Sequence, residues 1–266
     1  MGRRIHTTTA PAPARTTAPA PAPAVAPPRA PAAATSPLPV GVAGSWKLKF
    51  ADEFNAIKLD GSKWSTGWFG SGITPAVDTA DELNCYDPHQ VSVAAGELDI
   101  TAVAKQETCG GTTQPYATGL INSDGKFNFT YGVYEARVWL PGSNGKIADW
   151  PAIWADGQNW PDDGEIDVME GLGGSPCYTF HYNGGDPGGC TTVSGATAGW
   201  HTYAADWEPG SLTFYYDGRQ VWRTTTGVTN QPMYLILDLA ASNTISPPVI
   251  VPATMRVDYV RVWQHG

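Results

Sequence analysis

Glycine and proline interrupt the sequence from about residue 40 onwards, and this feature constrains the fold more than any other. They recur about every ten residues, and almost no segment shows the 3.6-residue period of an amphipathic helix. The segments between them are short and rich in β-branched and aromatic residues, which is typical of strands. We therefore expect strands at residues 46–50, 97–104, 131–140, 178–182, 201–207, 212–216, 233–239 and 255–263.

The connections between these segments indicate how the strands pair. Asp217 and Gly218 form a two-residue turn signal between two expected strands, as in an antiparallel hairpin. The expected strands do not alternate with helical segments, so parallel βαβ units are not expected. We predict an all-β fold, a concanavalin-like β-jelly-roll sandwich of two curved antiparallel sheets.

Residues 1–39 differ in composition from the rest of the chain. Nearly every residue from Thr7 to Pro39 is Ala, Pro or Thr, and such a segment cannot bury a core. We expect a disordered tail or linker there, followed by one domain at residues 40–266 that acts as a monomer. Arg3 and Arg4 resemble the start of a secretory signal, but no apolar stretch follows, so we expect the signal to be absent from this sequence.

Charge and cysteine usage narrow the class of protein. The net charge of −9 argues against nucleic acid or an anionic membrane as a partner, and the sequence has no membrane-spanning apolar stretch. The four cysteines are too widely spaced for the usual zinc pairs. Two disulfides are expected, with free buried thiols as the alternative. Pairing of sequence neighbours would join Cys85 to Cys109 and Cys177 to Cys190, but the sequence leaves the connectivity open. Disulfides would indicate a secreted protein.

Residues 165–170, Glu-Ile-Asp-Val-Met-Glu, place three acids in a segment that otherwise resembles a strand. Glu165 and Asp167 project from the same face of a strand. Glu170 would point into the core unless Met169 is the extra residue of a β-bulge, in which case all three acids share one face. The alternative is an ordinary solvated face. Crowded carboxylates without a neighbouring cation force one of them to keep its proton, which is typical of an active site.

Tryptophan is unusually abundant, with eleven residues in the chain. Four of them precede the acidic segment: Trp139, Trp150, Trp154 and Trp160. Burial in the core is the alternative for any one of them, but sugar rings stack on such flat apolar faces, so the set indicates a carbohydrate groove. Cleaving a glycosidic bond requires one carboxylic acid and one carboxylate, which two glutamates on one strand face can supply.

Residues 132–140 present two different faces. One is apolar, whereas the other carries Glu135, Arg137 and Trp139. This second face predicts either part of a ligand groove or a cross-strand ion pair beside a partly covered tryptophan.

Several motifs together resemble glycoside hydrolase family 16, and in particular its laminarinase-like endo-β-glucanases. They are residues 50–54 (Phe-Ala-Asp-Glu-Phe), 131–137, 150–154 (Trp-Pro-Ala-Ile-Trp), 160–170 and 257–262. The resemblance implies that residues 40–266 are a glycoside hydrolase catalytic domain that cleaves β-1,3-glucan with retention. It implies Glu165 as nucleophile, Glu170 as general acid/base and Asp167 as the assisting carboxylate. Met169 matches the bulged, laminarinase-like form of the motif.

The resemblance also implies residues that bind the substrate. They are Trp150, Trp154 and Trp160 along the groove, His181 beside the cleaved bond, and Glu82 in a loop that reaches the sugar. No cofactor is expected for catalysis. Family members often hold a structural calcium, here through Asp258 and through backbone carbonyls near Glu53 and Gly96, because oxygen ligands suit calcium.

One departure from the family pattern bears on the substrate. Laminarinases commonly have Asn and then Gly-Gly where this chain has Asp238 and then Ala241-Ser242. The acceptor side of the groove is therefore expected to differ, and mixed-linkage β-glucan is the second candidate substrate. Transglycosylation and a non-catalytic lectin are the alternative functions, and a secreted enzyme that acts on a polysaccharide is the favoured one.

Overall fold

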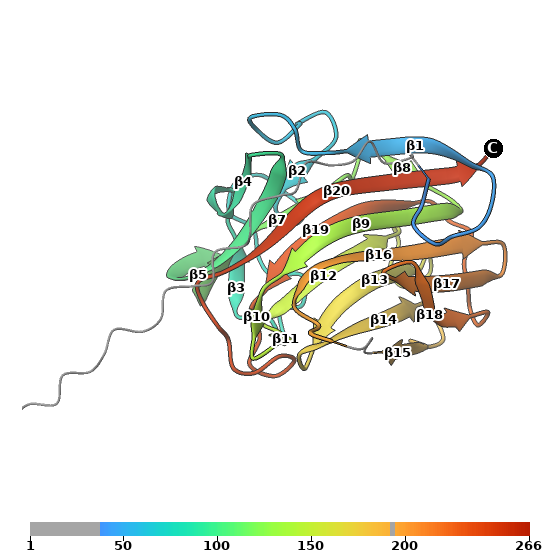
Figure 1. Ribbon diagram of the computed structural model, residues 1–266. Helices are drawn as coiled ribbons and strands as arrows, with labels where there is room; N and C mark the ends of the chain where they lie inside the picture. Colours follow the sequence, from blue (N-terminus) through green and yellow to red (C-terminus); the bar gives the residue numbers. More distant parts are fainter. Residues whose placement is uncertain (1–37, 192–194) are drawn as a thin grey trace, which may run out of the picture. The chain divides into compact units, whose positions relative to one another are not determined.

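The computed structural model describes residues 38–191 and 195–266 (Figure 1). This part of the chain forms one compact unit built from strands β1 to β20 and one short 3-10 turn, η1 (Pro88–Gln90). Within it, no helix has the length and apolar character needed to cross a membrane. The expected tail at residues 1–39 lies outside the described residues except for its last two positions.

The larger sheet has ten strands, and all its ladders are antiparallel except that of β3 with β6. Its order is β18 (Arg219–Thr224), β17 (Ser211–Tyr216), β16 (Gly199–Glu208), β9 (Gly132–Leu140), β20 (Ala253–His265), β5 (Glu97–Cys109), β6 (Thr112–Thr118) and β3 (Asn84–Tyr86). β1 (Trp46–Asp52) also pairs with β20, and β4 (Val91–Ala94) with β5.

The smaller sheet has eight strands, and β13 lies in its interior between β12 and β14. Its order is β15 (Gly188–Cys190), β14 (Ser175–His181), β13 (Glu165–Leu172), β12 (Trp150–Asp156), β19 (Met233–Ala240), β7 (Leu120–Asn122) and β2 (Ser65–Thr66), with β8 (Asn128–Phe129) beside β19. β10 (Gly142–Ser143) and β11 (Lys146–Ile147) form a separate short hairpin. Figure 1 shows the two curved sheets stacked as layers, which is the predicted jelly-roll sandwich.

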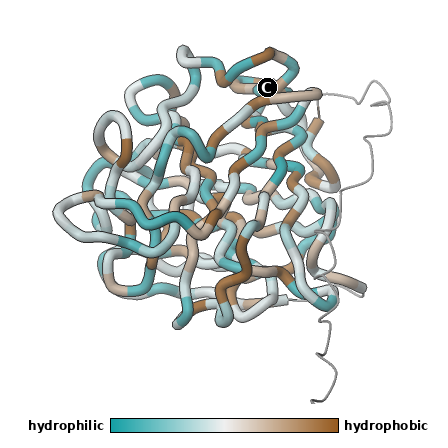
Figure 2. Tube along the Cα trace, turned by 90° about the vertical axis from the view of Figure 1, so that its left-hand side faces the viewer, coloured by the Kyte–Doolittle hydropathy of each residue, from teal (hydrophilic) through white to brown (hydrophobic). Residues whose placement is uncertain are grey.

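The main core lies between the two sheets because each strand alternates its side chains between two faces. Fully buried contributions include Ala136 and Val138 of β9, Ile153 and Ala155 of β12, and Ile166, Val168 and Met169 of β13. Hydrophobic and hydrophilic segments accordingly alternate along the trace in Figure 2. Burying one such Val, Ile or Met side chain contributes about 1.5–3 kcal/mol. A second apolar cluster on the other face of the smaller sheet contains Ala152, Trp154, Tyr234 and Ile236.

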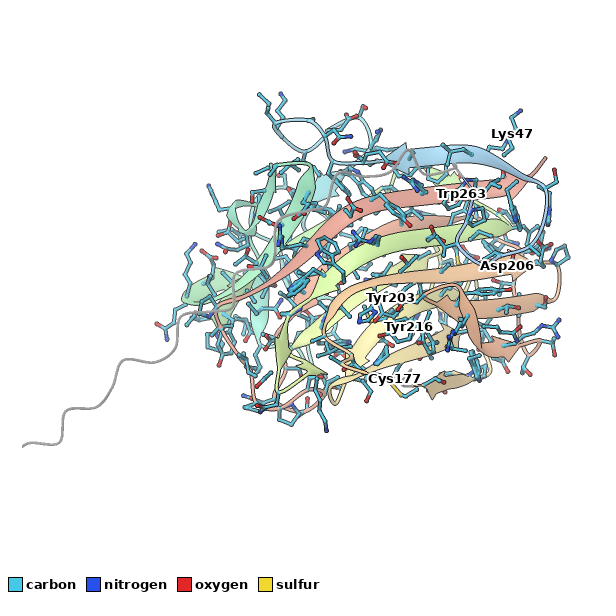
Figure 3. All side chains as sticks on the ribbon, viewed as in Figure 1. Lys47, Cys177, Tyr203, Asp206, Tyr216 and Trp263 are labelled. Atoms are coloured by element: carbon cyan, nitrogen blue, oxygen red, sulfur yellow. A yellow bond between two sulfur atoms is a disulfide. The ribbon has the colours of Figure 1, made fainter. Side chains whose placement is uncertain are left out.

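Every strand predicted from the sequence is present, with ends that differ by a few residues. The hairpin between β17 and β18 turns at Asp217 and Gly218, whose φ angles of 48° and 73° suit the twist of a two-residue hairpin. Next to this turn, Tyr216 stacks on its ladder partner Tyr203 with ring centroids 4.8 Å apart (Figure 3).

Both disulfides pair the cysteines as expected, and the alternative of free thiols is excluded. Cys85 of β3 is joined to Cys109 at the end of β5. Cys177 of β14, labelled in Figure 3, is joined to its ladder partner Cys190 of β15. The second bond therefore ties the short edge strand β15 to the smaller sheet.

The charged face of β9 does not contribute to the groove around the acids. It is the outer face of the larger sheet, because its apolar neighbours Tyr134 and Ala136 belong to the core. Arg137 Nη1 donates to Asp258 Oδ2 of β20 at 2.9 Å, and Trp139 packs edge-on against a second tryptophan of β16. The structure therefore supports the ion-pair alternative for this face.

Candidate active site

β13 contains the predicted bulge. Asp167 is opposite Trp154 on β12, whereas Met169 is opposite Ile153, so Val168 is left without a partner on that side. The ladder with β14 shows an irregularity between Asp167 and Glu170 as well. Val168 and Met169 are both fully buried in the main core. Val168 is thus unpaired on the β12 side, whereas on the β14 side neither Val168 nor Met169 has a partner. The consequence is as predicted, because the side chain of Met169 points away from the acids.

The bulge places Glu165, Asp167 and Glu170 on the groove face of the smaller sheet, where all three line one groove. Trp150 Nε1 donates to Glu170 Oε1 at 3.0 Å. Nε2 of His181, the ladder partner of Glu165, lies 3.0 Å from Asp167 Oδ2. One ligand-type atom each of Glu165, Asp167 and His181 falls within 4.8 Å of the others.

Burial is the main reason why the pKa values of these acids are raised. The pKa of Glu165 lies well above its ordinary value because of burial and then because of the charge of Asp167. The pKa of Asp167 is likewise far above normal through burial and the charge of Glu170. Burial also raises the pKa of Glu170, while the hydrogen bond from Trp150 opposes the rise. The cluster therefore holds its protons to higher pH than isolated carboxyl groups would, as a general acid requires.

The groove has a volume of about 850 Å³ and combines aromatic walls with an acidic floor. Its acidic lining residues are Asp78, Glu82, Asp156, Glu165, Asp167, Glu170, Asp186 and Asp238. Among the described residues, no lysine or arginine lines it, and His181 is its only basic side chain. A groove of this kind suits a neutral sugar chain and disfavours an anionic one.

All three tryptophans expected in the groove line it, but their environments differ. Trp160 is 58% exposed and offers an open ring face. Trp154 is largely buried, donates from Nε1 to Asp238 Oδ1 at 2.8 Å, and packs against Trp68 with ring centroids 5.4 Å apart. Trp154 therefore supports the wall, whereas Trp160 is available for stacking.

Glu82 also lines the groove, as expected, but its carboxyl group is buried. Oε1 accepts from the amide of Asp78 at 2.9 Å, and Oε2 accepts from Asn84 Nδ2 at 3.2 Å. Burial raises the pKa of Glu82 to about 7. Tyr86 lies beside it and donates from its hydroxyl to Asp238 Oδ2 at 3.2 Å.

The groove is also lined by Trp68, Phe69 and Asp156, which were not predicted from the sequence, and by Asp238. Asp156 carried a usable signal, because it follows Trp154 by two positions in one strand and so shares its face. Asp238 was noticed only as a departure from the family pattern. Trp68 and Phe69 lie in a loop, where no periodicity indicates direction.

The side chains of two residues expected at a calcium site already accept hydrogen bonds. Both carboxylate oxygens of Glu53 accept from Arg261, at 2.7 and 2.8 Å, and Asp258 accepts from Arg137. The only cluster of three or more metal-ligating side chains in the described part of the chain is the acidic one in the groove. A calcium ion would therefore depend on Asp258 and on backbone oxygens such as that of Gly96, and it stays a prediction.

A groove with tryptophan walls around three acids on one strand defines a glycoside hydrolase. Residues 81–247 match the family described as glycosyl hydrolases family 16, and the chain belongs to this family. The predicted resemblance and the class of enzyme are thus confirmed.

Named relatives agree with this assignment. The chain is 32% identical to glucan endo-1,3-beta-glucosidase A1 of Niallia circulans over 86% of this chain, although it spans only 39% of that relative's length. It is 31% identical to a beta-glucanase of Rhodothermus marinus over 84% of this chain and 86% of the relative. The catalytic domain of an endo-1,3-beta-glucanase (laminarinase) from Thermotoga petrophila RKU-1 has a similar structure, with a TM-score of 0.72 and 26% identity over 84% of this chain and 99% of that one.

Proposed function

We propose that this chain is a retaining, endo-acting glycoside hydrolase whose preferred substrate is β-1,3-glucan. The observation that carries the proposal is the bulge in β13, because it turns Glu165, Asp167 and Glu170 toward one groove. Relatives named as β-1,3-glucanases support the choice of substrate. Mixed-linkage β-glucan is the second candidate, because Asp238 stands in the groove where laminarinases commonly have Asn.

The reaction takes two displacements. Glu165 attacks the anomeric carbon of the donor sugar, and the glycosidic bond breaks as Glu170 donates its proton to the leaving oxygen. Glu170, now ionised, takes a proton from water, and this water displaces Glu165 from the anomeric carbon. The hydrogen bond from Trp150 stabilises Glu170 while it is ionised. A sugar acceptor in place of water would give transglycosylation.

Asp167 and His181 assist without bonding to the sugar carbon. The Asp167 carboxyl lies next to Glu165 and Glu170, and its charge helps to keep a proton on the cluster. His181 Nε2 lies near Asp167 Oδ2, so a protonated imidazole would balance negative charge as Glu165 is released. Secretion fits the two disulfides, which persist in oxidising compartments. We also expect a monomer, which size-exclusion chromatography with light scattering would check.

The test of this function is the release of new reducing ends from laminarin and from mixed-linkage β-glucan. We expect cleavage by the wild type, and at least about a 100-fold loss in Glu165→Gln, because the amide cannot form the covalent intermediate. Glu208→Gln, on the larger sheet and outside the groove, is the matched control and should retain activity. A wild type that binds laminarin but releases no reducing ends would be a lectin.

A further inference from the structure

Asp156 ends β12, and its carboxyl group lies in the groove beside Glu165. The two residues are direct ladder partners, and Tyr234 is the partner of Asp156 on the other side. Opposed side chains in an antiparallel ladder project from the same face with Cβ atoms about 5 Å apart. Glu170 is opposite Ala152, toward the other end of β12. Asp156 therefore belongs to the end of the groove where Glu165 lies.

The two carboxyl oxygens of Asp156 differ in their side-chain partners. The Tyr234 hydroxyl donates to Oδ2 at 3.2 Å. Oδ1 is buried and has no hydrogen-bond partner among the described residues, although Asp156 lines the groove and is only 5% exposed. Leaving a buried acceptor unpaired is costly, so such an atom in a groove indicates a group on the ligand that completes it.

We infer that Asp156 is a specificity-determining residue of the donor subsite, where Oδ1 forms a hydrogen bond with a hydroxyl group of the sugar ring that Glu165 attacks. The inference rests on the proposed function, since it takes Glu165 as the nucleophile. It deepens that function by naming a contact that orients the donor ring. Tyr234 holds the carboxyl group in place through Oδ2, which leaves Oδ1 for the sugar.

This contact also restricts the chemistry of the donor ring. Asp156, Glu165 and Asp167 meet at this end of the groove, and no lysine or arginine of the described residues lines it. A sulfate or carboxylate on the contacted carbon would meet like charges, and a methylated or acetylated oxygen could not donate a hydrogen bond to the ionised carboxylate of Asp156. The donor ring is therefore a neutral sugar with a free hydroxyl at that carbon.

The contact does not depend on one protonation state. Burial raises the pKa of Asp156 to about 7; the Tyr234 hydroxyl and the backbone amide of Gly157 act against the rise, Asp163 adds to it, and His181 opposes it. The titratable groups around it are Glu165 and Asp167 of β13, His181 of β14, Tyr234 of β19 and Asp163 in the loop before β13. A sugar hydroxyl donates to an ionised carboxylate and accepts from a protonated carboxyl, so either form can bind it.

The test pairs Asp156→Ala with substrates that lack one hydroxyl. The substrates are 4-nitrophenyl β-linked gluco-oligosaccharides, either intact or with one hydroxyl of the donor ring replaced by hydrogen. We expect Asp156→Ala to lower kcat/KM on the intact substrate by about 10- to 100-fold. On the deoxy substrate that lacks the contacted hydroxyl, Asp156→Ala and wild type should have equal kcat/KM, because the contact is already absent. Asp156→Asn, which keeps an oxygen and the shape of the side chain, should recover part of the loss on the intact substrate.

Asp206→Ala is the matched control. Asp206 lies on β16 in the larger sheet, also has a carboxyl oxygen without a partner among the described residues, and also has a pKa raised by burial, to about 6. Asp206→Ala should have the same kcat/KM as the wild type on the intact and on the deoxy substrates.

The donor contact would be disproved if Asp156→Ala lost the same factor in kcat/KM on every substrate, or if neither Asp156 variant lost activity. Either result would leave the proposed function standing. If Asp156→Ala does not fold, the kcat/KM of Asp156→Asn is compared with that of the wild type on the same intact and deoxy substrates. A wild type that cleaves no β-glucan overturns the proposed function together with this inference.

Discussion

Trp150 donates its indole N–H to Glu170 Oε1 at 3.0 Å, so a tryptophan of the sugar groove also sets the charge of an acid. The two side chains come from neighbouring strands, but Ala152 rather than Trp150 is the ladder partner of Glu170. The hydrogen bond favours the ionised form of Glu170 and so lowers its pKa, against the effect of burial. One side chain thus both lines the groove and lowers the pKa of Glu170.

Replacing Trp150 with Phe keeps an apolar ring but removes the donor, so the pKa of Glu170 should rise. Glu170 must be protonated to act as an acid, and the alkaline limb of the pH profile of kcat/KM should therefore move to higher pH. We expect kcat/KM at the optimum to fall by about 3- to 10-fold. Trp139→Phe, on the outer face of the larger sheet, should leave the profile unchanged. An alkaline limb that moves to lower pH would contradict the role of the hydrogen bond.

Azide distinguishes the roles of the two glutamates. Glu165→Ala and Glu170→Ala should each lower the hydrolysis of laminarin by about 100-fold or more. With an aryl β-glycoside that has a good leaving group, azide should restore turnover in both variants. Glu170→Ala should yield the β-glycosyl azide, because azide attacks the covalent intermediate in place of water. Glu165→Ala should yield the α-glycosyl azide, because azide takes the place of the nucleophile. NMR identifies the anomer of the glycosyl azide. If the two variants gave the opposite anomers, Glu170 would be the nucleophile and Glu165 the acid/base.

Deleting Val168 tests the bulge directly. The deletion removes the residue that has no partner on β12 and leaves Glu170 four positions after Glu165 in a regular strand. Residues four apart in a strand share a face, so all three acids should still line the groove and activity should remain measurable. The free energy of unfolding should fall by about 2 kcal/mol, because a fully buried valine is lost. Urea unfolding and reducing-end assays check this, and a folded but inactive variant would argue against the geometry.

Buried acids should make the protein less stable as the pH rises. Burial raises the pKa of Glu135, which lies outside the groove on the larger sheet, to about 7 from an ordinary value of 4.5. Between these values the folded state binds more protons than the unfolded state, so the free energy of unfolding falls as pH increases from about 4.5 to about 7. Glu135→Gln should flatten this slope without affecting catalysis. Urea unfolding at about pH 4.5, 5.5 and 7.5 measures it, and an unchanged slope would show that Glu135 ionises freely.

Period-two patterns explain why so much of the sandwich was predictable. In residues 255–263, for example, apolar residues occupy alternate positions, and Met255, Val257, Val260 and Val262 are buried between the sheets. The bulge was predictable for the same reason, since acids at positions 165, 167 and 170 cannot share a face in a regular strand. Both disulfides join cysteines that are near each other in the sequence.

The parts that escaped prediction depend on long-range contacts. For the charged face of β9, the sequence could not decide between a groove and an ion pair, because Asp258, the partner of Arg137, lies 121 residues away from it. Trp68 lies in a loop, and its position in the groove depends on packing against Trp154 of β12, which the sequence alone does not indicate. Asp238 lies in a strand, but the position of its carboxyl group depends on hydrogen bonds from Tyr86 and Trp154, which come from two other strands.

The interior position of β13 has a consequence for how the protein loses activity. Hydrogen-bonded ladders hold the strand on both sides, so the acids cannot leave their places unless the smaller sheet opens. Amide hydrogens of β13 should therefore exchange with solvent only through global unfolding, in contrast to those of exposed loops. On heating, catalysis should disappear together with the fold rather than before it.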